Sequence, residues 1–191
     1  MESNAKEDMG QALKQLARKK PFDKIAVSDI TAVSGYNRQT FYYHFQDKYE
    51  LLNWVYYQDI FADLVKGIDF DNWDGHLCRM LEKIKEESYF YQNTIRYAQD
   101  SFQEHLFHVT TELFGEAIEA LDTREKLSKP DKKFYAGFFA HGACGIVIDW
   151  MKRGMKEEPR VFVKFMKGLV LSSEKAAYER YSSETAVTKT D

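Results

Sequence analysis

The sequence predicts an all-α fold of about nine helices. Only three Pro and ten Gly occur among the 191 residues, so few positions interrupt regular structure. The alternation of apolar and polar residues that marks half-buried strands is hard to find, whereas apolar residues recur three and four positions apart in one segment after another. Helices packed around a shared apolar core are therefore the expected architecture.

The first helix is expected over residues 4–19, with Ser3 or Asn4 available as its cap. Its apolar stripe consists of Ala5, Met9, Ala12, Leu13, Leu16 and Ala17. Pro21 marks its end, because the residue before a proline is pushed out of the helical region of backbone conformation.

A short second helix and a tight turn should follow. Ser28 is expected to cap this helix, and Ile30 and Val33 are expected to face inward. Gly35 can supply the positive φ that a tight turn between two helices needs.

The turn should lead directly into a third helix and then a fourth. Asn37 can cap the third helix, in which Phe41 and Phe45 stand four positions apart and should face the core. Asp47 can cap a longer helix that runs towards Gly67.

The remaining chain reads as further helices of similar length. Capping signals and apolar spacing place them at about 76–87, 88–98, 101–120, 130–154 and 159–181. The break near residue 100 rests on Ser101 and Glu104, which have the spacing of a capping box. Residues 182–191 carry no apolar anchor and are expected to be disordered.

Charge and pattern together divide the chain into an amino-terminal domain over residues 1–52 and a helical domain over 53–181. Residues 1–52 hold eight Lys/Arg and seven Asp/Glu, a net charge of +1, whereas the rest holds 19 and 23, a net charge of −4. A nucleic-acid-binding domain should be the more basic part of its chain. The asymmetry has this sign, although it is small.

Two short helices joined at Gly35 form a helix-turn-helix pattern, whose second helix fits a major groove roughly 12 Å wide. The pattern alone is equally compatible with simple packing of helices. The stretch from Ile25 to Leu52, however, closely resembles the amino-terminal signature of the TetR family of transcription regulators. The resemblance is most specific over residues 40–45, 47–48 and 51–52.

The resemblance implies which residues read the operator, and therefore that DNA is a partner. Arg38 and Gln39 match positions that face base edges, and both side chains can form paired hydrogen bonds with a base. Tyr43 is expected to add a contact with a base or a methyl group. Tyr36 departs from the family pattern, which usually has a small aliphatic residue there, and Gln39 replaces what is often a small residue.

The positions that hold the phosphate backbone in the family carry hydroxyl, imidazole or ammonium groups here: Ser28, Thr31, Thr40, Tyr42, His44 and Lys48. Such contacts position the protein on the duplex but do not read its sequence. The alternative is that Tyr42 and His44 pack between helices and that Lys48 is a solvated charge at a helix start.

Residues 134–151 are apolar nearly all round and rich in small residues, so this helix must be covered on several sides. It resembles the penultimate helix with which TetR regulators dimerise, paired with residues 161–170 of the last one. The residues expected at the homodimer interface are Phe138, His141, Gly142, Gly145, Ile148, Phe162, Phe165, Met166 and Leu169. A two-fold dimer would span half-sites about 34 Å apart. A buried central helix in a monomer is the alternative.

The resemblance also implies an effector pocket in residues 53–181, where the many aromatic residues are equally typical of a helical core. No residue can be assigned to an effector. Residues 38–45 and 149–154 resemble a TetR subgroup that includes dihydroxyacetone-kinase operon activators. Control by a small molecule or by a coactivator protein, and activation as well as repression, therefore remain open.

Other chemistry has little support in the sequence. No Ser-His-Asp order, phosphate loop or dinucleotide fingerprint appears, so we expect neither an enzyme nor a cofactor. His105 and His108 share a helix face with Glu104 and Glu112, but a metal site needs a ligand from a second element, for which His76 is only a guess. We expect no metal.

Cys78 and Cys144 lie far apart in apolar contexts, as expected of a reducing compartment. No signal peptide or apolar run of about 18 residues is found, so we expect a cytoplasmic protein without membrane contact. The competing interpretation is a TetR-shaped protein-interaction or ligand-sensing module with weak affinity for DNA. The nearly neutral first domain keeps that interpretation open.

Overall fold

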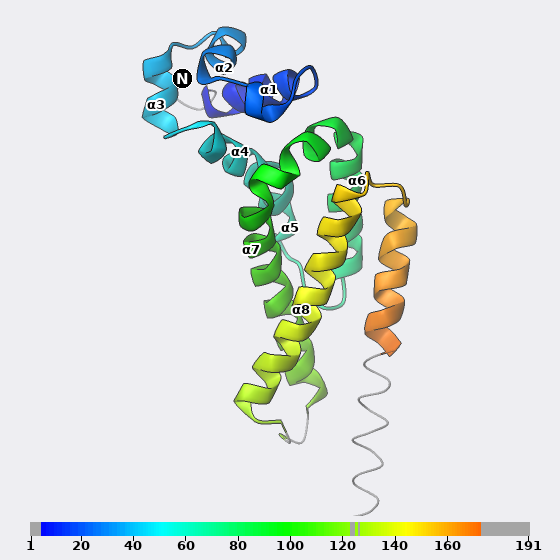
Figure 1. The fold of residues 1–191 in the computed structure, drawn as a ribbon. Helices are drawn as coiled ribbons and strands as arrows, with labels where there is room; N and C mark the ends of the chain where they lie inside the picture. The colour runs from blue at the N-terminus through cyan, green and yellow to red at the C-terminus, as the bar shows by residue number, and fades with distance from the viewer. Residues whose placement is uncertain (1–4, 123–124, 126, 173–191) are drawn as a thin grey trace, which may run out of the picture.

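The computed structural model describes residues 5–122, 125 and 127–172, and within these ranges the chain forms helices and no strand (Figure 1). The predicted all-α fold is confirmed. A small head of three helices lies at one end of an elongated helical body, and α4 joins the two (Figure 1). The expected tail 182–191 and the end of the last helix lie outside the described residues. None of the described helices is long and apolar enough to cross a membrane.

The head packs its helices around one apolar core. Its elements are α1 (Ala5–Ala17), the 3₁₀ turn η1 (Phe22–Lys24), α2 (Val27–Ser34) and α3 (Arg38–His44). Each helix turns its apolar face inward, and the fully buried side chains include Met9, Leu13, Phe22, Ile30 and Phe41. Burial of these faces is what stabilises helices this short, because isolated helices of this length are marginal in water.

The turn between α2 and α3 and the start of α4 use the expected residues. Gly35 has a φ of 78°. Asn37 Oδ1 accepts a hydrogen bond from the backbone N–H of Thr40 at 2.8 Å, and Asp47 Oδ1 accepts one from that of Tyr49 at 2.8 Å. Both side chains thus satisfy N–H groups that a helix start leaves without partners.

Two expectations about α2 are wrong. Asp29, not Ser28, supplies the side-chain hydrogen bond at the N-terminus of α2, because the Asp29 carboxylate accepts a hydrogen bond from the backbone N–H of Ala26 at 2.8 Å. Val33 is exposed, since α2 is so short that its buried side reaches little beyond Ile30 and Thr31.

The helix expected from Asp47 towards Gly67 contains a π-helical turn. It consists of α4 (Lys48–Tyr56), the π turn η2 (Tyr57–Phe61) and α5 (Ala62–Leu64). A π turn holds one more residue than an α turn, so it rotates the side chains that follow it. Ile60 and Phe61 within the π turn and Leu64 after it are buried.

The body consists of α6 (Trp73–Glu86), α7 (Ser88–Leu121), α8 (Lys129–Lys152) and a helix over 159–172. The break expected between residues 98 and 101 does not exist, because α7 is continuous through it. Ala98 and Phe102 are both buried and stand four positions apart on one face of α7. Their burial outweighs the local capping pattern of Ser101 and Glu104, and no Gly or Pro interrupts the segment.

The head is fastened to the body where the end of α1 meets α7. Asn93 of α7 donates through Nδ2 to the carbonyls of Ala17 and Lys20, at 2.7 and 2.9 Å. Its Oδ1 accepts from the backbone N–H of Phe22 at 3.0 Å. One amide therefore satisfies three backbone groups that the end of α1 and the following turn would otherwise leave without partners.

A buried ion cluster lies at the same junction. The ammonium of Lys14 in α1 pairs with the carboxylates of Asp59 in η2 and Glu87 just before α7, the latter at 2.9 Å. Lys14 itself is buried. The cluster thus joins the first helix of the head to two elements of the body.

We expect Lys14→Met to lower the free energy of unfolding by about 2 kcal/mol, because it removes the buried cation shared by Asp59 and Glu87 and leaves Glu87 to the more distant Arg18, at 3.6 Å. The effect falls short of that at a deeply buried pair, since both carboxylates are partly exposed. Lys19→Met, at an exposed lysine nearby, should change the same quantity by less than about 0.5 kcal/mol. Urea unfolding followed by circular dichroism measures both, and equal effects would contradict a structural role for Lys14.

Candidate nucleic-acid interface

The outer side of α3 carries the three residues expected to read bases. Arg38 and Gln39 are exposed in the first turn, and Tyr43 is 82% exposed. Within the described part of the chain, the side chains of Arg38 and Gln39 form no hydrogen bond or ion pair. Phe41 and Phe45 anchor the opposite side of α3 in the core. A helix with one fixed face and free polar side chains on the other is suited to a DNA groove.

Four of the residues expected at phosphates reach solvent around α3. Ser28 and Tyr42 are exposed, while Thr40 and His44 are half-buried. The Thr40 hydroxyl donates to Asn37 Oδ1 at 3.1 Å. The His44 ring packs edge-on against Tyr43 with centroids 4.9 Å apart. This contact joins neighbours on α3 and is not the packing between helices that the alternative foresaw, and part of the His44 side chain stays accessible.

Thr31 does not present its side chain to solvent. It is buried, and its hydroxyl donates to the carbonyl of Ser28 at 3.2 Å. The hydroxyl is used within α2, so the structure gives it an internal role rather than the surface position that the expected phosphate contact requires.

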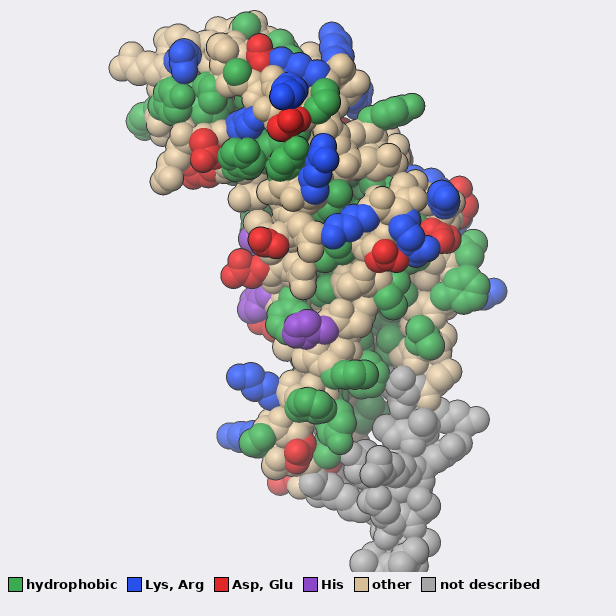
Figure 2. Space-filling view, in the orientation of Figure 1, with side chains coloured by type: hydrophobic (Ala, Val, Ile, Leu, Met, Phe, Trp, Pro, Cys, Tyr) green, Lys and Arg blue, Asp and Glu red, His purple; other side chains and the backbone are tan. Residues whose placement is uncertain are grey.

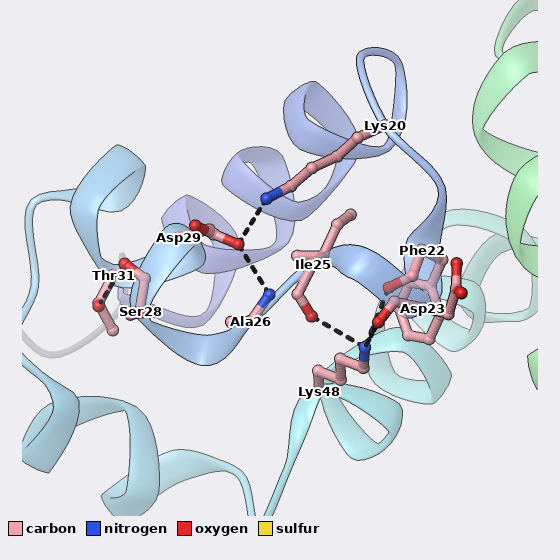
Figure 3. A network of polar contacts seen from close by, with 9 residues as sticks. All are labelled: Lys20, Phe22, Asp23, Ile25, Ala26, Ser28, Asp29, Thr31 and Lys48. Atoms are coloured by element: carbon pink, nitrogen blue, oxygen red, sulfur yellow. Dashed lines mark hydrogen bonds and ion pairs between the residues drawn. The ribbon is translucent and has the colours of Figure 1, made fainter.

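Lys48 also points into the head, as Figure 3 shows. Its Nζ donates to the backbone carbonyls of Phe22, Asp23 and Ile25, at 3.0, 3.1 and 2.8 Å. An ammonium has three N–H donors, so all of them are engaged. Burial lowers the pKa of Lys48, against the opposing effect of the nearby carboxylates, Asp23 first. Lys48 thus holds η1 against the start of α4, with its three donors directed at the head.

Two further contacts that the sequence did not reveal hold α2 and the turn before α3. Lys20 Nζ donates to Asp29 Oδ2 at 2.6 Å (Figure 3). This hydrogen bond, followed by that from Ala26, holds the pKa of Asp29 below its ordinary value. Tyr36 donates its hydroxyl to Asp8 Oδ2 at 3.0 Å. The departure of Tyr36 from the family pattern was the signal for the second contact, because its long side chain reaches α1.

A second candidate site is an apolar cavity of about 550 Å³ in the body. Its walls come mainly from α7 and α8, with further residues from the segment between Leu64 and Leu77 and from the helix over 159–172. Its volume lies within the range of small-molecule sites. The polar side-chain groups among the lining residues are those of Trp73, Thr110, His141 and Cys144, and no charged Lys, Arg, Asp or Glu is among the described lining residues. The Thr110 hydroxyl is already engaged, because it donates to the carbonyl of Leu106 and lies 3.4 Å from Cys144 Sγ.

The residues expected at the dimer interface separate into two groups. The exposed ones are Phe138, His141, Gly142 and Gly145 of α8, with Phe165 and Leu169 of the helix over 159–172. Ile148, Phe162 and Met166 are instead buried within the chain, where Phe162 packs on Trp150 with ring centroids 5.6 Å apart. These three residues lie on the sides of the two helices that face the chain's own core. The exposed residues lie on the opposite sides of the same helices.

The histidines of α7 are engaged in local contacts. His105 Nδ1 lies 2.7 Å from the carbonyl oxygen of Ser101, and its ring packs against Phe61 with centroids 5.3 Å apart. His108 lies 3.5 Å from Glu112. Among the described residues, no three His, Cys, Asp or Glu side chains converge on a common metal position.

Known proteins resemble this chain in both of its parts. Residues 11–55 match the model of "Bacterial regulatory proteins, tetR family", and residues 71–172 match that of a "Transcriptional regulator C-terminal region". The chain is 30% identical over 151 residues to the HTH-type dhaKLM operon transcriptional activator DhaS of Lactococcus lactis subsp. lactis, covering 76% of this chain and 79% of that protein.

Solved structures share the fold over nearly the whole chain. The dihydroxyacetone kinase operon activator DhaS superposes with a TM-score of 0.69 at 26% identity, covering 90% of this chain and 97% of that one. The fatty acid degradation regulator FadR from Bacillus halodurans superposes with a TM-score of 0.56 at 15% identity, covering 90% and 96%. The second likeness shows the fold alone.

We expect Lys48→Met to lower the free energy of unfolding by about 2 kcal/mol, because three backbone carbonyls lose a charged donor. Lys24→Met is the matched control, since Lys24 is exposed and its nearest carboxylate, that of Asp23, lies 3.8 Å away. Urea unfolding gives both values, and hydrogen exchange of the amides of residues 22–26 should speed up in the first variant only. If the two variants are equally mild, the ammonium of Lys48 does not hold the head together.

Proposed function

Since this chain is a transcriptional regulator of the tetR family of bacterial proteins, we propose that it binds a palindromic DNA operator as a homodimer through α3. The observation that carries the proposal is the free polar edge of α3. Arg38 and Gln39 stand in its first turn, where the end of a recognition helix meets base edges. Tyr43 extends this edge by one turn.

The phosphate contacts come from the rim of α3 and the start of α2. Ser28, Thr40, Tyr42 and His44 offer hydroxyl and imidazole groups there. Lys48 supports these phosphate contacts indirectly, because it holds in place the turn that precedes α2. Thr31 acts within α2 in the same supporting way.

The dimer forms through the exposed apolar side of α8 and the helix over 159–172. A single recognition helix reads too few base pairs to find one site in a genome, and two-fold symmetry doubles the sequence that is read. We assign the head to residues 1–52 and the body to 53–181, with α4 shared between them because it crosses that boundary. A regulator of DNA in a bacterium acts in the cytoplasm.

The body controls the head through the cavity or through a partner protein. α7 supports this assignment, because Leu106 and Thr110 line the cavity while Asn93, on the same continuous helix, holds the end of α1. A ligand that moves α7 would therefore move the attachment of the head. Activation is favoured over repression, since the relative at 30% identity is named a transcriptional activator.

A TetR-shaped interaction or ligand-sensing module with weak DNA affinity is the second candidate. The net charge of only +1 on residues 1–52 favours it. Purification of the chain with a stoichiometric protein, together with no shift of any operator-sized duplex from the flanking DNA, would decide for this candidate.

We expect Arg38→Ala to relax the base preference at one position of each half-site and to cost about 1 to 3 kcal/mol in binding the preferred duplex. Gln39→Ala should act in the same way at a neighbouring position. Selection of bound duplexes from a randomised pool measures the preference. Arg79→Ala, at an exposed arginine of α6, is the control and should change nothing. An unaltered preference in both α3 variants would remove the base-reading role.

Binding should weaken with salt by about 0.9 in the log–log slope for each phosphate that a cationic side chain neutralises. We expect Lys48→Met to weaken binding at every salt concentration but to leave that slope unchanged, because its ammonium faces the head. A titration of duplex binding from low to high salt tests this. A slope reduced by about one would instead make Lys48 a direct phosphate ligand.

A further inference from the structure

The apolar cavity opens on the face of the body proposed for dimerisation. Five of its lining residues are themselves exposed: Phe138, His141, Gly142, Ile146 and Leu169. Since a residue that both lines a cavity and faces solvent lies at its mouth, the mouth runs along α8 and the helix over 159–172. In Figure 2, apolar side chains gather over this lower part of the body.

The mouth continues into a wider apolar face. Phe134 and Phe138 stand four positions apart on α8 and are 70% and 67% exposed, and Phe165 of the helix over 159–172 is 71% exposed. An aromatic side chain carries about 150 to 250 Å² of surface. With Ile146, Val161 and Leu169, the exposed apolar surface is on the order of 600 Å² per chain. Two copies face to face would bury on the order of 1,200 Å², which reaches the range of stable interfaces.

Glycines on these two helices point to the same close approach. Gly137, Gly142 and Gly145 of α8 and Gly168 lie inside helices, where glycine is less favourable than alanine by roughly 0.5–1 kcal/mol. A Cβ at any of the four would meet no atom within 4 Å in this chain. Packing within the chain therefore does not require glycine there, whereas a helix from outside could use the space.

Ion pairs also join the helix over 159–172 to α6, on the side away from this face. Three ion pairs fasten the last helix and the residue before it to α6: Asp74 to Lys167 at 2.6 Å, Glu82 to Arg160 at 3.2 Å and Lys85 to Glu158 at 2.8 Å. These pairs occupy the charged edge of the helix over 159–172. Its apolar edge, with Val161 and Phe165, is thereby presented as a preformed surface beside α8.

We infer that a second copy of the chain closes the mouth of the cavity, so that an uncharged apolar ligand and the dimer stabilise each other. The inference rests on the dimer of the proposed function. In a single chain the ligand would keep its exposed side in water, whereas in the dimer that side is covered by the partner's α8. Linkage is reciprocal, so a ligand that binds the dimer more tightly must also tighten the dimer, by the same factor for each ligand bound.

The wall of the cavity determines the chemical class of the ligand. A charged ligand would lose its hydration without meeting an opposite charge, because the described lining residues carry no Lys, Arg, Asp or Glu. Thr110 has already used its hydroxyl proton within α7. Trp73, through its indole N–H, and His141 at the mouth are the groups suited to a polar end of a ligand, and His141 Nδ1 lies 2.8 Å from the Gly137 carbonyl.

The test uses the full chain and N-phenyl-1-naphthylamine, an uncharged apolar dye whose fluorescence rises in apolar surroundings. Phe165→Glu should break the dimer without altering the cavity wall, since Phe165 is not a lining residue. We expect a monomer by analytical ultracentrifugation and dye affinity reduced about tenfold or more. Tyr89→Glu, at an exposed aromatic residue near the start of α7, is the matched control and should stay dimeric with unchanged affinity.

Leu113→Trp fills the cavity from α7 and should abolish dye binding while the chain remains a dimer. Dilution of the unmodified protein through its dimer dissociation range should lower dye affinity in parallel, which keeps the test decisive if a variant fails to fold. A monomeric Phe165→Glu that binds dye as tightly as the unmodified chain overturns the inference but leaves the proposed dimer standing. A Phe165→Glu that stays dimeric contradicts the proposed interface itself. Dye binding unaffected by Leu113→Trp, or absent from the unmodified chain, overturns the inference as well.

Discussion

The short turn η1 depends on being held from both sides, and the rest of the head depends on that turn. On one side, Asn93 of the body accepts a hydrogen bond from the backbone N–H of Phe22. On the other side, Lys48 of α4 donates a hydrogen bond to the backbone carbonyl of Phe22. Backbone groups in a short turn have no helical partners, and leaving them unsatisfied is costly. Since α2 begins only three residues after η1, these two side chains determine where the helix-turn-helix lies relative to the body.

The same turn connects α3 to the body, which contains the apolar cavity. α7 touches η1 at Asn93 and lines the cavity from Leu106 onward, a distance of about 20 Å along one unbroken helix. A rigid element that touches two sites can bias both when it has two positions. The π turn in the helix that begins at α4 lies beside α7, through the contact of Phe61 with Phe102, and is a natural place for such a shift.

Local rules were enough to predict the fold class, the caps Asn37 and Asp47 and the buried pair Phe41 and Phe45. They failed where a contact distant in the sequence decided the outcome. Ser101 and Glu104 have the spacing of a capping box, but burial of Phe102 keeps α7 helical. Nothing within a few residues of Lys48 indicates that its partners lie 23 to 26 positions earlier. The exposed edge of α3 was predictable because it is simply the side opposite its phenylalanines.

Arg38 and Gln39 contribute little to holding the chain together, since their side chains are exposed and make no polar contact within its described part. Exchanges at such surface positions usually change stability by no more than about 0.5 kcal/mol. After a gene duplication, these two residues could therefore diverge without endangering the fold. With the proposed base-reading role, one substitution at either position would change the preferred operator, while the interior that positions α3 stays the same.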